Sequence, residues 1–99
     1  MRSQDIIAGR GGFKIAEDGV AIATADGYNF YGFVPHADIT ITNLLVGTTD
    51  LSSTVSGITF KQGIFYPIGR NITPGYAKEI TVSGGDACLY LTEDSPTKY

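Results

Sequence analysis

Cysteine, histidine and tryptophan are nearly missing from this sequence of 99 residues, which holds one cysteine, one histidine and no tryptophan. A single cysteine, Cys88, cannot form an internal disulfide, so the fold does not depend on one. No run approaches the roughly 20 apolar residues of a membrane-spanning helix. The first stretch, MRSQDIIAGRGG, lacks the continuous apolar core of a secretory signal. We therefore expect a chain that folds in a reducing cytoplasm and has no membrane partner.

Basic charge is also scarce. Seven Lys and Arg residues stand singly along the chain against ten Asp and Glu residues, which gives a net charge of −3. Because no stripe of basic side chains could neutralise a run of phosphates, we expect no nucleic-acid partner. With 42% apolar and 17% charged residues, the composition is that of a globular protein. A chain of this length forms one domain, whose thin core oligomerisation commonly supplements.

Helical periodicity is missing as well. Thirteen Gly and four Pro residues break up the chain, and no window carries apolar residues at the i, i+3, i+4 and i+7 positions of a helix. Short apolar alternation recurs instead, between turn signals. The sequence predicts an all-β fold over residues 13–92: a compact single-domain β-sandwich or jelly-roll-like barrel of about eight short antiparallel strands. Residues 1–12 are expected to be a flexible arm and residues 93–99 a polar, frayed tail.

Four segments carry detailed strand predictions. The Asp-Gly pair at residues 18–19 predicts a hairpin between residues 13–16 and residues 20–25. In ADITITNLLV, the side chains of Ile39, Ile41 and Leu45 are expected to face inward. The polar stretch at residues 47–57 predicts a loop with a short edge strand near Val55. In ACLYL, residues 87–91, we consider Ala87, Leu89 and Leu91 facing the core. Cys88 and Tyr90 would then share the opposite face.

The stretch IFYPI, residues 64–68, is too broken for a helix and too apolar for an exposed loop. Pro67 has no N–H, so the stretch must lie at a sheet edge, a bulge or a strand end. An aromatic edge strand is an aggregation hazard unless something covers it. Both IFYPI and YNFYGFV, residues 28–34, carry large apolar groups on two faces. We therefore expect the core to cover one face of each, and a loop or a neighbouring subunit to cover the other.

Residue types that perform chemistry do not gather in a recognisable active site. His36 and Cys88 lie far apart, and neither has the neighbours of a metal-ligand set. The GRGG stretch at residues 9–12 lacks the Lys and Ser/Thr of a phosphate-binding loop. Several aspartates next to glycines or small residues fit turn chemistry, since the spaced pattern of a calcium loop is missing. The sequence therefore predicts a non-enzymatic protein with no cofactor and no metal.

Aromatic residues supply the remaining functional signal, with six Tyr and five Phe. These side chains are favoured at protein interfaces, because large rigid groups bury area at little entropic cost, and they also line carbohydrate-binding clefts. We expect most of them to fill the core and the rest to contact a partner. The candidate contact residues are Tyr28, Tyr31, Phe65, Tyr66 and Tyr76.

Residues 58–91, ITFKQGIFYPIGRNITPGYAKEITVSGGDACLYL, resemble the C-terminal half of small structural proteins of tailed bacteriophages. In those proteins an apolar strand leads into a Gly-aromatic turn like KQGIFYPIG, then a strand like KEITVSGG and a short last strand like ACLYL. The resemblance implies a capsid decoration (cement) protein, which would be β-rich and often trimeric and would bind the outside of an assembled head.

The expected partners are therefore further copies of the chain, as a homo-oligomer with a trimer favoured, and the major capsid protein. The expected location is the virion surface, after synthesis in the host cytoplasm, with residues 1–12 as a candidate docking arm. Two alternatives stay open: a phage tail, neck or fibre module, and a carbohydrate-binding β-sandwich that stacks tyrosines on sugars.

Overall fold

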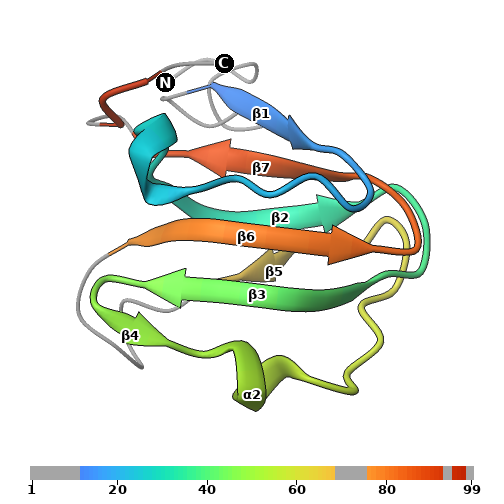
Figure 1. Ribbon diagram of the computed structural model, residues 1–99. Helices are drawn as coiled ribbons and strands as arrows, with labels where there is room; N and C mark the ends of the chain where they lie inside the picture. Colours follow the sequence, from blue (N-terminus) through green and yellow to red (C-terminus); the bar gives the residue numbers. More distant parts are fainter. Residues whose placement is uncertain (1–11, 69–75, 93–94, 98–99) are drawn as a thin grey trace.

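The computed structural model describes residues 12–68, 76–92 and 95–97. The described part holds seven strands and two short helices (Figure 1). The strands are β1 (Phe13–Ala16), β2 (Phe30–Pro35), β3 (Thr40–Val46), β4 (Thr49–Asp50), β5 (Tyr66–Pro67), β6 (Ala77–Ser83) and β7 (Ala87–Leu91). The helices are the 3-10 turn η1 (Thr24–Asp26) and the single-turn α2 (Ser52–Val55). The prediction of an all-β fold is confirmed.

The strands pair antiparallel throughout and form two layers. Their order is β1-β7-β2-β6-β3-β4, with β5 beside β2. Between β2 and β6 only Phe30 and Ala77 are paired, because the same edge of β6 also pairs Ile22 with Ile80. The sheet thus divides at this point into a first layer, β1-β7-β2-β5, and a second layer, β6-β3-β4. The sheet does not close into a barrel, so the arrangement is sandwich-like.

Alternating side chains fill the space between the two layers. On β7, the side chains of Ala87, Leu89 and Leu91 are completely buried, while Cys88 and Tyr90 point away from the core, as the sequence predicts. The largest side chains that are almost fully buried come from both layers: Phe30, Phe33, Ile39, Ile80, Leu89, Leu91, Val46, Val82 and Pro35. Burial of these groups is the main force that holds the layers together.

The inward set predicted for β3 is correct at its start and wrong at its end. Ile39 and Ile41 are buried. A register shift between Ile41 and Asn43 then inserts one extra residue, so Leu44 faces the core and Leu45 does not. Such a bulge reverses the side-chain alternation beyond it, because the period of a strand is two residues.

The predicted hairpin at residues 18–19 is wrong, although the turn itself forms. The N–H of Val20 donates to the Glu17 carbonyl at 3.0 Å, and Gly19 has a φ of 74°, which suits glycine. The chain then crosses to the second layer, where Ile22 pairs with Ile80, and β1 pairs with β7 instead. A local turn signal predicts that the chain reverses at this point, but it does not predict which strand β1 pairs with.

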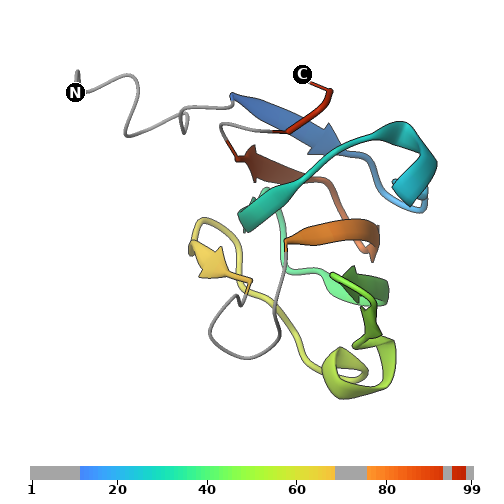
Figure 2. The same cartoon turned by 90° about the vertical axis from the view of Figure 1, so that its left-hand side faces the viewer.

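The edge strand predicted near Val55 is also wrong, because residues 52–55 form α2. The carboxylate of Asp50 accepts the Ser52 N–H at 2.9 Å and also bonds the Ser52 hydroxyl. These local hydrogen bonds favour a helical turn over pairing with a neighbouring strand. Figure 2 shows α2 at the end of the molecule opposite to β1.

The IFYPI stretch lies at a sheet edge, as predicted. Only Tyr66 and Pro67 pair with β2, opposite Phe33 and Gly32. Residues 1–11 of the predicted arm lie outside the described residues. Within the predicted tail, Ser95 is buried and its hydroxyl accepts the Asn29 N–H at 3.0 Å, so this part of the tail is packed against the domain.

Candidate functional site

The outer face of the first layer is apolar. Register pairs Phe13 with Tyr90, Ile15 with Cys88, and Val34 with the same Cys88. Because cross-strand partners point to the same side of a sheet, these five side chains share the face that turns away from the core. Phe13 is 44% exposed and the other four are half-buried. Antiparallel sheets usually carry polar residues on an outer face, so this face is unusual.

Phe65 completes the apolar face by lying over Gly32. A Cβ atom on Gly32 would stand 2.3 Å from the Phe65 ring, so only glycine leaves room for it. The ring centroid of Phe65 is 5.6 Å from that of Tyr90 and 6.2 Å from that of Tyr31. Phe65 is itself 44% exposed. We call the whole set the aromatic face; its residues are Phe13, Ile15, Tyr31, Val34, Phe65, Cys88 and Tyr90.

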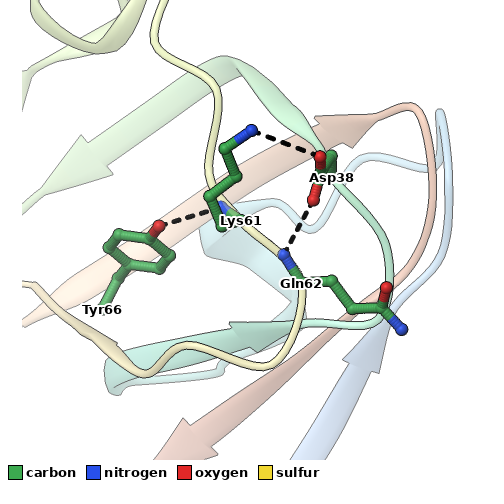
Figure 3. A network of polar contacts seen from close by, with 4 residues as sticks. All are labelled: Asp38, Lys61, Gln62 and Tyr66. Carbon is green, nitrogen blue, oxygen red and sulfur yellow. Dashed lines mark hydrogen bonds and ion pairs between the residues drawn. The ribbon is translucent and has the colours of Figure 1, made fainter.

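A polar network fixes the turn that carries Phe65 (Figure 3). Asp38 accepts the Gln62 N–H at 3.0 Å and lies 3.5 Å from the Lys61 ammonium. The Lys61 N–H in turn donates to the Tyr66 hydroxyl at 2.8 Å. The Gln62 N–H, and then Lys61, hold the pKa of Asp38 below its ordinary value. Asp38 is therefore ionised at neutral pH and acts as an anchor for residues 61–66.

Replacing Asp38 by alanine is expected to loosen this turn, because the Gln62 N–H loses its acceptor. Hydrogen exchange at Gln62 should accelerate severalfold, while Asp38→Asn, which keeps an acceptor oxygen, should change it less. Since folding lowers the pKa of Asp38, the contribution is present above the unfolded value of about 4 and is lost as the pH falls through the folded value. Unchanged exchange at Gln62 in Asp38→Ala would contradict this role.

The outer face of the second layer is polar, in contrast to the aromatic face. Glu79 accepts the Thr24 hydroxyl at 2.6 Å and the Asn43 side-chain amide at 3.4 Å. The Thr24 hydroxyl and then the Asn43 amide hold the pKa of Glu79 below its ordinary value. The nearby Thr42 is exposed, and its hydroxyl donates to the Thr81 carbonyl. The protein thus has one water-compatible face and one apolar face.

An acidic row borders the aromatic face at one end. The paired rows end at Ala16, Ala87 and Pro35, and the residues that follow or precede them are Glu17, Asp86 and His36; the His36 N–H donates to the Asp86 carbonyl at 2.8 Å. The Asp86 carboxylate accepts the Asp18 N–H at 2.9 Å, which is turn chemistry. Among the described residues, no group of three or more His, Cys, Asp or Glu side chains could hold a metal ion.

Burial further favours the neutral form of the titratable groups of the aromatic face. Desolvation raises the pKa of Tyr31, of Tyr90 and of the Cys88 thiol. A thiol whose pKa is raised is a poor nucleophile, because the thiolate is the reactive form. Cys88 thus behaves as a small apolar group, and the face presents no charge at neutral pH.

The structure divides the five predicted contact residues among different places. Tyr31 and Phe65 lie on the aromatic face. Tyr28 lies in a separate hollow of about 290 Å³, where the Lys14 ammonium stands 5.5 Å from its ring centroid. Tyr66 packs on the core, with its ring centroid 4.9 Å from that of Phe60.

Tyr76 is half-buried next to β6, and its carbonyl accepts the Gly47 N–H at 2.8 Å. The contact role of all five candidates stays a prediction. Sequence reasoning did not select Phe13 and Tyr90, although the alternation in ACLYL already placed Tyr90 outside the core.

Comparison of the chain with protein-family models, with curated proteins and with solved structures finds no match. Over the described ranges, no helix is long and apolar enough to cross a membrane. The fold and the site define an antiparallel, sandwich-like β protein with one polar and one apolar outer face.

Proposed function

We propose that this protein is a non-enzymatic structural protein that assembles with other subunits through its aromatic face. More specifically, we propose a capsid decoration protein that binds the outside of a phage head. The observation that supports assembly is the apolar outer face of β1-β7-β2. The virion setting rests on the resemblance of residues 58–91 to small phage structural proteins.

The size of the aromatic face supports assembly of modest strength. Three strands about 4.8 Å apart and two rows of side chains, with Phe65 beside them, cover roughly 300 Å². Apolar patches of this size are among the largest on a monomer and are often functional. A stable interface buries about 800 Å² per partner, so the face would be the apolar centre of a larger footprint. Repeated contacts on a lattice would strengthen such weak pairings through effective concentration.

The proposed occupant of the aromatic face is a second copy of this chain. The face is neutral, so copies can oppose it without burying like charges. The acidic row of Glu17 and Asp86 stands at one end, where water screens repulsion between copies. We favour a trimer, in which three aromatic faces meet around the axis and form a shared core. The assembled oligomer would then bind the major capsid protein through its remaining surface.

The geometry of the rings favours a protein partner over a carbohydrate. The ring planes are inclined by 59° between Tyr31 and Phe65, and by 67° between Phe65 and Tyr90. Inclined arrangements of this kind are the ones that aromatic side chains adopt with one another in protein cores and interfaces. A tail, neck or fibre module would use the same face, so binding to assembled heads separates it from a decoration protein.

Placing a charge on the aromatic face tests the proposal. Tyr90→Glu is expected to weaken self-association roughly 30-fold, since a charge at the centre of an apolar interface acts like the loss of a hot spot. The matched control is Thr42→Glu, an exposed strand residue on the polar face, which should associate like the wild type. Light scattering measures the mass of each variant, and co-sedimentation with bare phage heads measures capsid binding.

Phe13→Glu serves as a second variant at the periphery of the face, where less of the fold depends on the side chain. A folded Tyr90→Glu or Phe13→Glu protein that assembles like the wild type would contradict the proposal. If the wild type self-associates but does not bind heads, the subunit interface would be supported and the decoration role would be contradicted.

A further inference from the structure

The structure assigns a second binding site, on the opposite side of β2 from the aromatic face, for a small molecule that carries one non-polar ring. We call this site the apolar hollow; its floor is formed by Phe33, Leu44 and Phe60, and its mouth lies between Val55 of α2 and Pro67 of β5. The site goes beyond the proposed assembly role and shares no residue with the aromatic face.

The hollow exists because the two layers do not meet at this side of the sandwich. β5 is only two residues long and α2 is one turn, so neither covers the gap between β2 and β3. The floor is rigid. The Phe33 and Tyr66 rings are stacked with centroids 5.4 Å apart, and the Phe60 ring meets the Tyr66 ring edge-on. A preformed floor reduces the entropic cost of binding a ligand.

The chemistry of the lining selects a non-polar ligand. Apart from the Thr54 hydroxyl at the mouth, the hollow is lined almost entirely by carbon. The Tyr66 hydroxyl is directed at Lys61, which does not line the hollow, and accepts the Lys61 N–H at 2.8 Å (Figure 3). A polar atom of a ligand would lose its hydrogen bonds to water and find no replacement. Only a group without hydrogen-bond donors and acceptors can therefore enter without losing hydrogen bonds.

The volume of the hollow sets the size of the ligand. It measures about 190 Å³, and an apolar cavity of about 150 Å³ in another protein is known to bind benzene. The hollow therefore suits one ring with no more than a small alkyl substituent. A ligand seated there would contact β2, β3 and α2 together and would stabilise the fold by mass action.

Titration of the full chain with benzene and with pyridine, its polar isostere, tests this site. Methyl NMR of the Ile, Leu and Val side chains follows the binding. We expect saturable shifts with benzene at Ile41, Leu44 and Val55, and at least tenfold weaker binding of pyridine, whose ring nitrogen would be buried without a partner.

Two filling variants and one control make the result specific. Val55→Phe and Thr54→Phe place a ring at the mouth and are expected to reduce benzene affinity at least tenfold. Ser53→Phe carries the same change on α2 at an exposed position outside the lining, and should bind like the wild type. Benzene that causes no saturable shift, or that binds a folded Val55→Phe or Thr54→Phe protein as tightly as the wild type, would overturn the assignment. These readouts are independent of self-association.

Discussion

Gly32→Ala is expected to lift Phe65 off the aromatic face while the fold survives. The new Cβ would lie 2.3 Å and 2.6 Å from two atoms of the Phe65 ring and 3.0 Å from the Tyr66 carbonyl oxygen. The ring can swing into water because it is already 44% exposed, but the carbonyl belongs to β5 and must shift with the strand. Overpacking of this kind costs about 1–3 kcal/mol of unfolding free energy. Urea denaturation measures that cost, and light scattering measures the accompanying loss of self-association.

A double-mutant cycle separates this steric effect from any other effect of the added methyl group. In Phe65→Ala, the two ring contacts at residue 32 are gone and only the Tyr66 carbonyl oxygen at 3.0 Å remains, so adding Gly32→Ala should cost less than it does in the wild type. We therefore expect the two changes to be non-additive by about 1 kcal/mol, which is typical for residues in contact. Additive costs would show that Phe65 does not depend on the glycine below it.

Phe33→Ala is expected to have the largest effect on stability. Phe33 is 2% exposed, and its ring centroid lies 5.3 Å from that of Phe60 and 5.4 Å from that of Tyr66. Removing such a ring costs about 3–5 kcal/mol, out of a total of about 5–15 kcal/mol for a typical domain. The variant should therefore be largely unfolded or close to it at 37 °C, as far-UV circular dichroism on heating would show.

The same strand offers the contrasting control. Tyr31 lies two residues away from Phe33 but on the aromatic face, because the register shift between Phe30 and Gly32 makes it an extra residue in β2; its ring centroid is 6.3 Å from that of Tyr90. Tyr31→Ala should lower stability much less than Phe33→Ala and should weaken self-association, whereas Phe33→Leu should lower stability and leave association intact. A Tyr31→Ala protein with the stability loss of Phe33→Ala would mean that the outer face is structural.

Sequence patterns predicted the features that depend on neighbours along the chain. The alternation in ACLYL separated the buried Leu89 from the outward Tyr90, and the missing N–H of Pro67 placed IFYPI at a sheet edge. Both features follow from the geometry of a single strand. Of the second face of residues 28–34, the structure shows cover only at Gly32, where Phe65 lies over it; cover by a neighbouring subunit stays a prediction.

Features that depend on distant parts of the chain could not be predicted in this way. The aromatic face forms because β1 pairs with β7, which brings Phe13 next to Tyr90, yet the turn at residues 18–19 suggested a local partner for β1. The register shift after Ile41 in β3 has no sequence signal that we identified. Pattern reasoning gives the face of each side chain, whereas pairing between strands decides which faces join into one surface.

The reactivity of Cys88 tests most directly whether the aromatic face is buried on assembly. Cys88 is the only cysteine of the chain and lies at the centre of that face, half-exposed in the single subunit. Its rate of alkylation is measured at fixed pH across a dilution series, together with the mass by light scattering. A cysteine introduced as Thr42→Cys in a Cys88→Ser background reports on the polar face. We predict that alkylation of Cys88 slows as the mass rises, while the Thr42→Cys site reacts at a constant rate. A protein that assembles and leaves Cys88 as reactive as in the monomer would contradict the assignment of the aromatic face as the subunit interface.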